Sequence, residues 1–436
     1  MAMVVKTNMS AVRTLNTLNS NTSALQKSLA KVSSGMKINS AQDDASGYAI
    51  SERMRVRIRS LDQANQNTQN DSSLMKTAEG AVANTVELLR ALKEKAINAA
   101  NDSNTDEDRA TIQKEINQFI DQVDDNALVQ FNGKYLVDGS KNNVVTSTKT
   151  ILLNQSLSTT TVEDSVLTDL KDRVGNSLEI VTTDKYQVSW VTNGITTTSS
   201  GTLSSSITLK DLFALTSIAE YTFTSDGQQA IGTDKFNDEV YTPDKTGGVA
   251  LLAKTAGVGY QIAGFNISIL DQDGNVKKAA NAAIDQFKQY QMAENETEGG
   301  NKALNFHIGS EANVAIKVGL GDMRAESLGL KGSAGDRISV TTKDNANAAI
   351  NVIENALTKA LDQQTTIGAI EARLEYTATN LTTSSENVQA AESTIRDADM
   401  AKEMTNYTKS NVLLQAAQAM LAQANQNSSA VLSLLQ

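Results

Sequence analysis

Two stretches near opposite ends of the chain repeat apolar residues at alternating spacings of three and four. This period of seven is typical of a helix that packs lengthwise along another helix. The first stretch spans residues 15–32 and the second spans residues 353–398. A helix as long as the second cannot bury its apolar stripe in a compact fold of its own, so we expect the N-terminal half to be its partner. The seam residues are Leu15, Leu18, Leu25, Leu29 and Val32 in the first stretch, and Ile367, Ile370, Leu374, Leu381, Val388 and Ile395 in the second.

The segment of residues 412–424 differs from these stripes because apolar side chains surround most of its circumference. A helix that is apolar on all sides needs more than one neighbour. We therefore expect this segment to be poorly ordered in a single copy and to gain order when copies associate. The residues expected to pack in such an assembly, besides the N-terminal seam, are Leu413, Leu414, Ala417, Met420, Leu421, Leu434 and Leu435.

Composition excludes several classes of protein. The net charge of -11 leaves no basic excess to neutralise nucleic-acid phosphates. The 436 residues include no cysteine, so disulfides, thiolate metal sites and thiol nucleophiles are absent. No stretch reaches the ~18 apolar residues that span a bilayer. The first residues contain no continuous apolar run, which predicts that there is no cleaved secretory signal.

The order of segments predicts helices at both ends and a different kind of fold between them. Helices are expected over residues 1–34 and 45–101, then from Asp106, and again from about Asn345. Between residues 143 and 301 the chain is rich in Ser, Thr and Gly, with β-branched runs at 186–191 and 260–270. Asn193-Gly194 and Asp273-Gly274 predict hairpin turns. Two helix-like stretches interrupt this part, at residues 162–174 and 279–292, and short strands are expected within residues 306–340.

The fold class predicted from this order is mainly α. Both termini form a long discontinuous rod of coiled-coil or helical-bundle type, with a short β-hairpin region and an inserted α+β outer domain. The single proline, Pro243, lies in the insert and leaves the helices uninterrupted.

Residues for catalysis or for a cofactor were not found. The only histidine, His307, cannot supply the histidine pair of a zinc protease and has no obvious nucleophile beside it. Asp271, Asp273 and Asn275 resemble part of a calcium loop, but the glycine and the closing acid are misplaced, so a hairpin turn is favoured. We expect no enzyme activity, no metal and no cofactor.

Four motifs of this chain closely resemble those of bacterial flagellin, in the same order. They are SSGMKINSAQDDASGYAISERMRVRIRSLDQANQN at residues 33–67, LVQFNGKYLVDGS at 128–140, FHIGSEANVAIKVGLGDMRAESLGL at 306–330 and ESTIRDADMAKEMTNYTKSNVLLQAAQAMLAQANQ at 392–426. The resemblance covers roughly residues 1–142 and 303–436. It implies a terminal coiled-coil core domain (1–41 and 401–436), a helical rod domain (42–142 and 303–400) and a variable surface-exposed insert (143–302).

The resemblance implies a structural subunit that polymerises into the filament of the bacterial flagellum, outside the cell. It implies export in an unfolded state by the flagellar type III apparatus, guided by residues 1–40, and assembly at the filament tip. The implied partners are further copies of the chain, an export chaperone on residues 404–436, the filament cap and the hook-junction proteins. An adhesin-like flagellin with a ligand-binding insert and a hook-filament junction protein are the alternatives; no membrane and no nucleic acid are expected as partners.

Two further surfaces follow from the resemblance. Vertebrate innate-immune receptors recognise many flagellins on a surface that corresponds here to Arg90, Ala91, Lys95 and Glu115. Ala91 and Lys95 depart from the arginine and leucine that strongly recognised members carry, so weak recognition is expected. The Ser/Thr-rich run in the insert either carries O-linked sugars, as many flagellins do, or is an unmodified polar loop. The hydroxyls concerned are Thr196, Thr197, Thr198, Ser199, Ser200, Ser204, Ser205 and Ser206.

Overall fold

A computed structural model describes residues 8–143, 146–162, 164–216, 219–224, 230–234, 237–241, 248–296 and 302–434. The chain divides into two compact units. Unit 1 consists of Met1–Asn67, His307–Val314 and Tyr376–Gln436. Unit 2 consists of Thr68–Phe306 and Ala315–Glu375.

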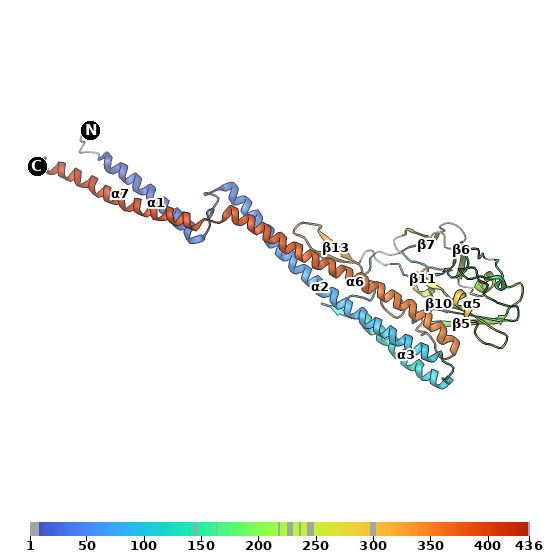
Figure 1. The fold of residues 1–436 in the computed structure, drawn as a ribbon. Coiled ribbons are helices and arrows are strands. Elements are labelled where there is room, and N and C mark those ends of the chain that lie inside the picture. The colour runs from blue at the N-terminus through green and yellow to red at the C-terminus, as the bar shows by residue number, and fades with distance from the viewer. Residues whose placement is uncertain are drawn as a thin grey trace. The chain divides into compact units, whose positions relative to one another are not determined.

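Long helices dominate the described chain, as the heptad patterns predicted (Figure 1). The five longest are α1 (Met9–Ser34), α2 (Ala45–Ala99), α3 (Asp106–Ala127), α6 (Lys343–Arg396) and α7 (Met400–Leu434). Local chemistry fixes their ends. Gly35 ends α1 in a left-handed conformation, with φ of 71°, and donates its N–H to the Lys31 carbonyl. Thr105 and Asp108 form a reciprocal capping box at the start of α3.

Unit 1 holds two antiparallel helix pairs. α1 lies beside α7, and Asn8 and Asn21 donate side-chain hydrogen bonds to the carbonyls of Ala424 and Leu413 (Figure 1). The early part of α2 lies beside the late part of α6. The second pair is held by a hydrogen bond of 2.9 Å from Ser385 to Asp62 and by a small core of Leu61, Ala64 and Leu381, against which Val388 packs.

Unit 2 contains the rest of α2, α3, the first part of α6 and all the longer strands. Arg109 of α3 donates hydrogen bonds to the carbonyls of Ala99 and Asn101, which closes the α2–α3 hairpin. The strands and short helices that follow lie between α3 and α6 in the chain. They are β1 (Gln130–Phe131), β2 (Lys134–Tyr135), β3 (Ile151–Asn154), β4 (Lys185–Thr192), β5 (Ile195–Thr202), α4 (Leu209–Ala214), β6 (Ala219–Thr224), β7 (Ala230–Thr233), β8 (Glu239–Tyr241), β9 (Gly248–Ala253), β10 (Ile262–Leu270), α5 (Lys278–Ile284), β11 (Lys288–Gln291), β12 (Leu304–His307) and β13 (Ala315–Val318).

Two antiparallel sheets build the α+β insert. One has the strand order β10-β4-β5 and the other β11-β3-β9-β6. Three phenylalanines, Phe213, Phe265 and Phe287, meet in the core between these elements, with the Phe265 and Phe287 ring centroids 4.9 Å apart. The predicted turn at Asn193-Gly194 is confirmed: both residues have positive φ and connect β4 to β5.

Several local predictions were wrong. Residues 162–174 were expected to form a helix, yet the structure has only a 3-10 turn there, Leu167–Asp169. Bridges from Val166 to Thr208 and from Lys171 to Ser177 replace the helical hydrogen bonds. The helix expected over residues 279–292 ends at Ile284, and the chain continues as β11. The short strands expected within residues 306–340 are confirmed, since the end of β12 and all of β13 lie there.

The insert rests on α6 through a close backbone approach. A side chain at Gly264 would come within 2.7 Å of Val352. Asn351 and Asn355 of α6 donate hydrogen bonds to the carbonyls of Phe265 and Ala263 on β10. The insert is therefore packed against unit 2's helices, and the three-part domain division stays a prediction.

Candidate assembly surface

The α1–α7 pair leaves its apolar side chains open to solvent. None of residues 9–34 is buried, although α1 lies along α7 over most of its length. In the part of α7 whose side chains are described, residues 400–427 and 429, Ala417 alone is buried, at 7% exposed. Two adjacent helices thus provide too little cover for the leucines and methionines they carry.

The structure places the predicted packing residues in two groups. Leu18, Leu25 and Val32 of α1 and Leu414 and Leu421 of α7 are partly buried and lie on the helix pair's inner side. Leu15 and Leu29 of α1, and Leu413 and Met420 of α7, are exposed, with Met420 at 62%. Leu434 ends α7 without a described side chain, and Leu435 lies outside the described residues.

Additional apolar side chains, which the sequence analysis did not single out as packing residues, enlarge the exposed face of α7. Val412 is 59% exposed, and Met400 and Met404 are also exposed. A shallow groove of about 560 Å³ runs between Met404, Val412 and Leu413. Met404 is four residues after Met400 on α7 and Val412 is eight residues after Met404, so the three lie within about a third of the helix circumference and one neighbouring helix could cover them together.

The predicted rod residues have a different environment. Ile367 and Leu374 are fully buried in unit 2. Leu381 is buried in unit 1 beside Leu61, and Val388 packs on that core. Ile370 and Ile395 are partly buried. The helices α2 and α6 therefore satisfy most of their apolar seam within one copy, in contrast to α1 and α7.

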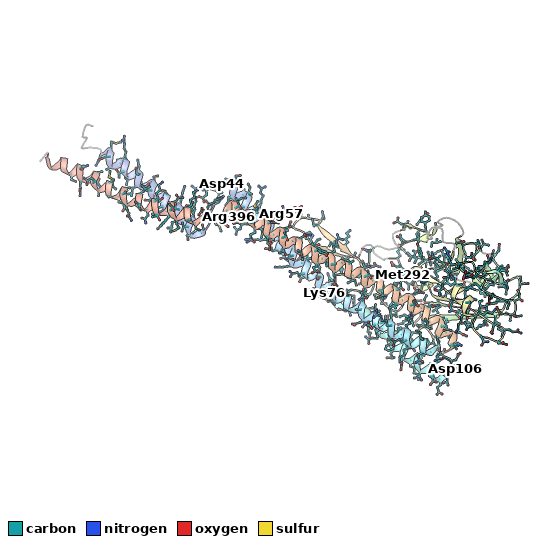
Figure 2. All side chains as sticks on the ribbon, in the orientation of Figure 1. Asp44, Arg57, Lys76, Asp106, Met292 and Arg396 are labelled. Carbon is teal, nitrogen blue, oxygen red and sulfur yellow. The ribbon has the colours of Figure 1, made fainter. Side chains whose placement is uncertain are left out.

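Arg396 joins the two helix pairs of unit 1, a role that the sequence analysis missed. Its side chain is 8% exposed, and Nη1 donates to Glu52 Oε1 at 2.6 Å and to Ser51 Oγ at 3.0 Å. Its guanidinium carbon lies 5.5 Å from the centroid of the Tyr48 ring. Figure 2 labels Arg396 and the nearby Asp44. The hydrogen bond from Arg396 lowers the pKa of the Glu52 carboxyl below its ordinary value.

Backbone hydrogen bonds complete this joint. The Lys37 N–H donates to the Arg396 carbonyl at 2.8 Å, and the Ala398 N–H donates to the Gly35 carbonyl at 2.9 Å. Asp399 then caps α7 by accepting hydrogen bonds from the N–H groups of Ala401 and Lys402. The sequence signal for the boundary between α6 and α7 was the run Asp397-Ala398-Asp399, since short acidic side chains favour helix N-termini.

Among the residues that the structure describes, no group of three or more His, Cys, Asp or Glu side chains could hold a metal ion. His307 is exposed on β12. No helix in the described ranges is long and apolar enough to cross a membrane.

Comparison with known proteins decides the family. Residues 5–142 match the bacterial flagellin N-terminal helical region, and residues 350–435 match the bacterial flagellin C-terminal helical region. A flagellin from Clostridium tyrobutyricum is 34% identical over 97% of this chain and 99% of its own length. The chain belongs to the bacterial flagellin family. It is a structural subunit of the flagellar filament, and the adhesin and hook-junction alternatives are not favoured.

A second curated relative agrees with this flagellin assignment. A flagellin from Bacillus subtilis (strain 168) is 29% identical over 99% of this chain and all of its own length. Among solved structures, the flagellar hook associated protein-3 from Legionella pneumophila is 15% identical, with a TM-score of 0.33, and the match covers 78% of this chain and 97% of that one. A TM-score this low carries no argument about function.

The surface implied for innate-immune recognition is occupied by internal ion pairs. Lys95 Nζ lies 2.5 Å from Glu115 Oε2, and Arg90 Nη1 lies 2.5 Å from Glu87 Oε1. Ala91, which follows Arg90 in the sequence, is partly buried. The ammonium of Lys95 thus lies against the Glu115 carboxylate.

The predicted hydroxyl run is not a loop over its first part. Thr196, Thr197, Thr198, Ser199 and Ser200 lie on β5, at the edge of its sheet. Thr197, Thr198 and Ser200 are exposed there, and Ser204, Ser205 and Ser206 are exposed in the turn that follows. Pairing with β4 over its whole length fixes this strand.

Proposed function

We propose that the α1–α7 pairs of many copies pack together to form the filament's inner wall, and that this packing drives polymerisation. The observation that carries the proposal is the absence of any buried residue within α1, residues 9–34, in a single copy. Leucines on both helices remain at the surface where further helices could cover them.

The free energy of such packing is substantial. Covering several hundred Å² of apolar surface for each terminal helix contributes on the order of 10 kcal/mol at ~25 cal/mol per Å², before ordering costs are subtracted. Ordering costs of ~1–2 kcal/mol for each residue oppose this gain in proportion to the number of residues that become fixed. Because the terminal helices are only partly ordered in the free subunit, assembly is favoured at an existing filament end. There, neighbouring copies are already in place to cover the apolar side chains.

Seeded elongation tests this proposal. Purified full-length chain is added to sheared filament fragments, and filament length is measured by electron microscopy. We expect the full chain to elongate the fragments and a chain lacking residues 405–436 to fail, while circular dichroism shows that the truncated chain keeps its remaining helices. Elongation by the truncated chain at the normal rate would overturn the proposal.

The exposed face of α7 also suits an export chaperone. We propose that the chaperone covers residues 404–436 in the cytoplasm, because Met404, Val412 and Leu413 present an apolar surface that would otherwise associate prematurely. Residues 1–40 are proposed to guide export by the flagellar type III apparatus without cleavage. The filament cap, at the growing tip, and the hook-junction proteins are further proposed partners of the same surface.

Innate-immune recognition is proposed to be weak. The Lys95–Glu115 ion pair must break before a receptor can use Glu115, and Ala91 offers no guanidinium. Surface plasmon resonance with a flagellin-binding receptor ectodomain should give a dissociation constant well above the nanomolar range. Nanomolar binding by the wild-type chain would contradict this expectation.

O-linked sugars remain a proposal for the exposed hydroxyls of Thr197, Thr198, Ser200 and Ser204–Ser206. These hydroxyls are accessible at a sheet edge and in the turn after it, where a sugar would also hinder pairing with another strand. Intact-mass spectrometry of native filaments decides the matter, because a mass equal to that of the bare chain removes the proposal. No catalytic role is proposed for any residue.

A further inference from the structure

The sulfur atoms of this chain are unevenly placed. The sequence has 11 methionines and no cysteine, so every sulfur atom is a thioether. Among the residues whose side chains the structure describes, every exposed methionine belongs to α1 or α7. These four exposed methionines are Met9, Met400, Met404 and Met420, each at least 43% exposed. The exposed sulfur of the described chain is therefore confined to the candidate assembly surface.

The other described methionines are shielded from solvent to different degrees. Met75 of α2 and Met323 are buried. Three more are partly buried, namely Met36, Met54 and Met292, the last of which is labelled in Figure 2. The sulfur of Met36 also accepts a hydrogen bond of 3.3 Å from Arg396 Nε, which occupies one of its lone pairs. A dissolved reagent that attacks sulfur therefore reaches α1 and α7 first.

Hydrogen peroxide is such a reagent, and it converts a methionine thioether to a sulfoxide. A sulfur lone pair attacks one peroxide oxygen, the O–O bond breaks and an S–O bond forms. The second oxygen leaves as water, so the sulfur loses two electrons and the peroxide gains them. The product is polar and chiral, whereas the thioether is flexible and apolar. Burying a polar group without a hydrogen-bond donor is unfavourable.

Two of the four exposed methionines lie on different sides of α7. Met404 lines the groove of about 560 Å³ together with Val412 and Leu413. Met420 lies about 160° around the helix from Met404 and ~24 Å along it, at 3.6 residues per turn and 1.5 Å per residue. Sulfoxides at these two positions would therefore disturb packing against different neighbouring helices.

We propose that the four exposed methionines are oxidation sites through which peroxide prevents the free subunit from assembling. In the free subunit the sulfoxide oxygens are solvated, so oxidation leaves the fold intact. They lose that water when another copy covers α1 and α7, so oxidised subunits assemble poorly. Copies already in the filament are shielded from peroxide. Methionine sulfoxide reductases, with a thiol as electron donor, reverse the modification.

This inference rests on the proposed function, because it requires that copies bury these side chains against each other. Full-length free subunit is treated with hydrogen peroxide, and peptide mass spectrometry locates each added oxygen. We expect the four exposed methionines to be oxidised while Met75 and Met323 stay reduced. Circular dichroism should show unchanged helix content. Equal oxidation of Met75, Met323 and the four exposed methionines would overturn the inference.

Assembly of the same material is then measured. After removal of the peroxide, oxidised subunits are added to untreated filament fragments, and sedimentation gives the critical concentration. We expect it to rise at least about tenfold and to fall again after treatment with methionine sulfoxide reductases and dithiothreitol. A normal critical concentration for subunits oxidised at all four positions would overturn the inference.

Leucine variants identify the sulfur atoms responsible. The quadruple variant combines Met9→Leu, Met400→Leu, Met404→Leu and Met420→Leu, which keeps an apolar side chain of similar volume at each position. Each variant is compared with itself before and after peroxide, so an effect of the substitutions on untreated assembly cancels. We expect peroxide to leave the critical concentration of the quadruple variant nearly unchanged.

The matched control is Met54→Leu with Met292→Leu, which replaces partly buried methionines outside α1 and α7 and should keep the full peroxide effect. A quadruple variant as sensitive to peroxide as the wild-type chain would overturn the inference and leave the proposed function in place. A wild-type chain that fails to elongate the fragments even without peroxide would overturn both.

Discussion

At the scale of single residues, Arg396 connects several segments of unit 1. It lies where α6 ends, and its nearly buried guanidinium contacts Ser51, Glu52 and Tyr48 on the start of α2. The backbone of the same residue accepts the hydrogen bond from Lys37. The Arg396 side chain thus holds the end of α6 against the start of α2, and its backbone carbonyl holds the connector between α1 and α2.

Replacing Arg396 should loosen this joint locally. Arg396→Ala removes a donor from the fully buried Ser51 hydroxyl, and we expect amide exchange over residues 36–52 to become roughly ten- to a hundredfold faster. Hydrogen-exchange mass spectrometry measures the change. Arg55→Ala is the matched control, because Arg55 also binds Glu52 but is 40% exposed, and it should change exchange less than about fivefold. Equal effects of the two variants would contradict the role given to Arg396.

Asp285 makes the insert's stability depend on pH. Burial raises the pKa of its carboxyl to about 7, although its oxygens accept hydrogen bonds from Asn266 and from the Ile267 N–H. The folded pKa therefore exceeds the unfolded value of 3.8, so the folded insert binds the proton more tightly. Its stabilising effect is complete below about pH 4 and is lost as the pH rises through about 7, with an upper limit of ~4 kcal/mol.

Thermal unfolding of the full chain checks this dependence. The transition assigned to the insert by its tryptophan, Trp190, should move to higher temperature as the pH falls from 8 to 5. Asp285→Asn should flatten that trend, because the amide does not titrate. A transition that is equally pH-dependent in the variant would show that another group is responsible.

At the scale of elements, the sequence predicted long helices well and the small insert elements poorly. Gly35 and the Thr105–Asp108 pair set helix ends through local chemistry that can be recognised in sequence. Residues 162–174 have helical spacing, but Leu167 and Leu170 are buried in the insert's core by pairing with distant segments. Such pairing depends on tertiary contacts that spacing does not contain.

For the candidate assembly surface too, the sequence predicted the local features but not the tertiary contacts. The heptad identified the apolar face of α1, and the apolar circumference of residues 412–424 in α7 indicated that one partner is insufficient. The Arg396 joint was missed because its members come from three segments that are adjacent only in the fold. The Ser/Thr run was read as a loop because its polar residues mask a strand that is fixed by pairing with β4.

A charged side chain on the exposed apolar face of α7 should weaken assembly without changing the fold of the subunit. Met420 is exposed in a single copy, so Met420→Asp should leave the subunit's helix content unchanged. In the filament the carboxylate would lose solvent, and we expect the critical concentration to rise at least about tenfold, or ~1.4 kcal/mol. Val174→Asp, at an exposed site of the insert, is the matched control and should have no effect. A normal critical concentration for Met420→Asp would exclude this face from the packing.

At the scale of the whole molecule, the two units carry different features. Unit 1 carries the open α1–α7 pair, and unit 2 carries the insert, whose sheets enclose a core of their own. Deleting residues 143–302 should therefore leave polymerisation intact in sedimentation assays. The deletion also uncovers Val352 and neighbouring alanines of α6, so we expect the helical part of unit 2 to unfold at lower temperature. Loss of polymerisation in a folded deletion variant would place an essential contact in the insert.

The central claim is that the terminal helices bury their apolar side chains against other copies of the chain. Hydrogen exchange measured on the free subunit and on the filament, under one buffer, tests it most directly. We predict rapid exchange for residues 9–34 and 400–434 in the free subunit and strong protection of the same amides in the filament, while the buried parts of α2 and α6 are protected in both. Equal protection of the terminal helices in the two states would contradict the account.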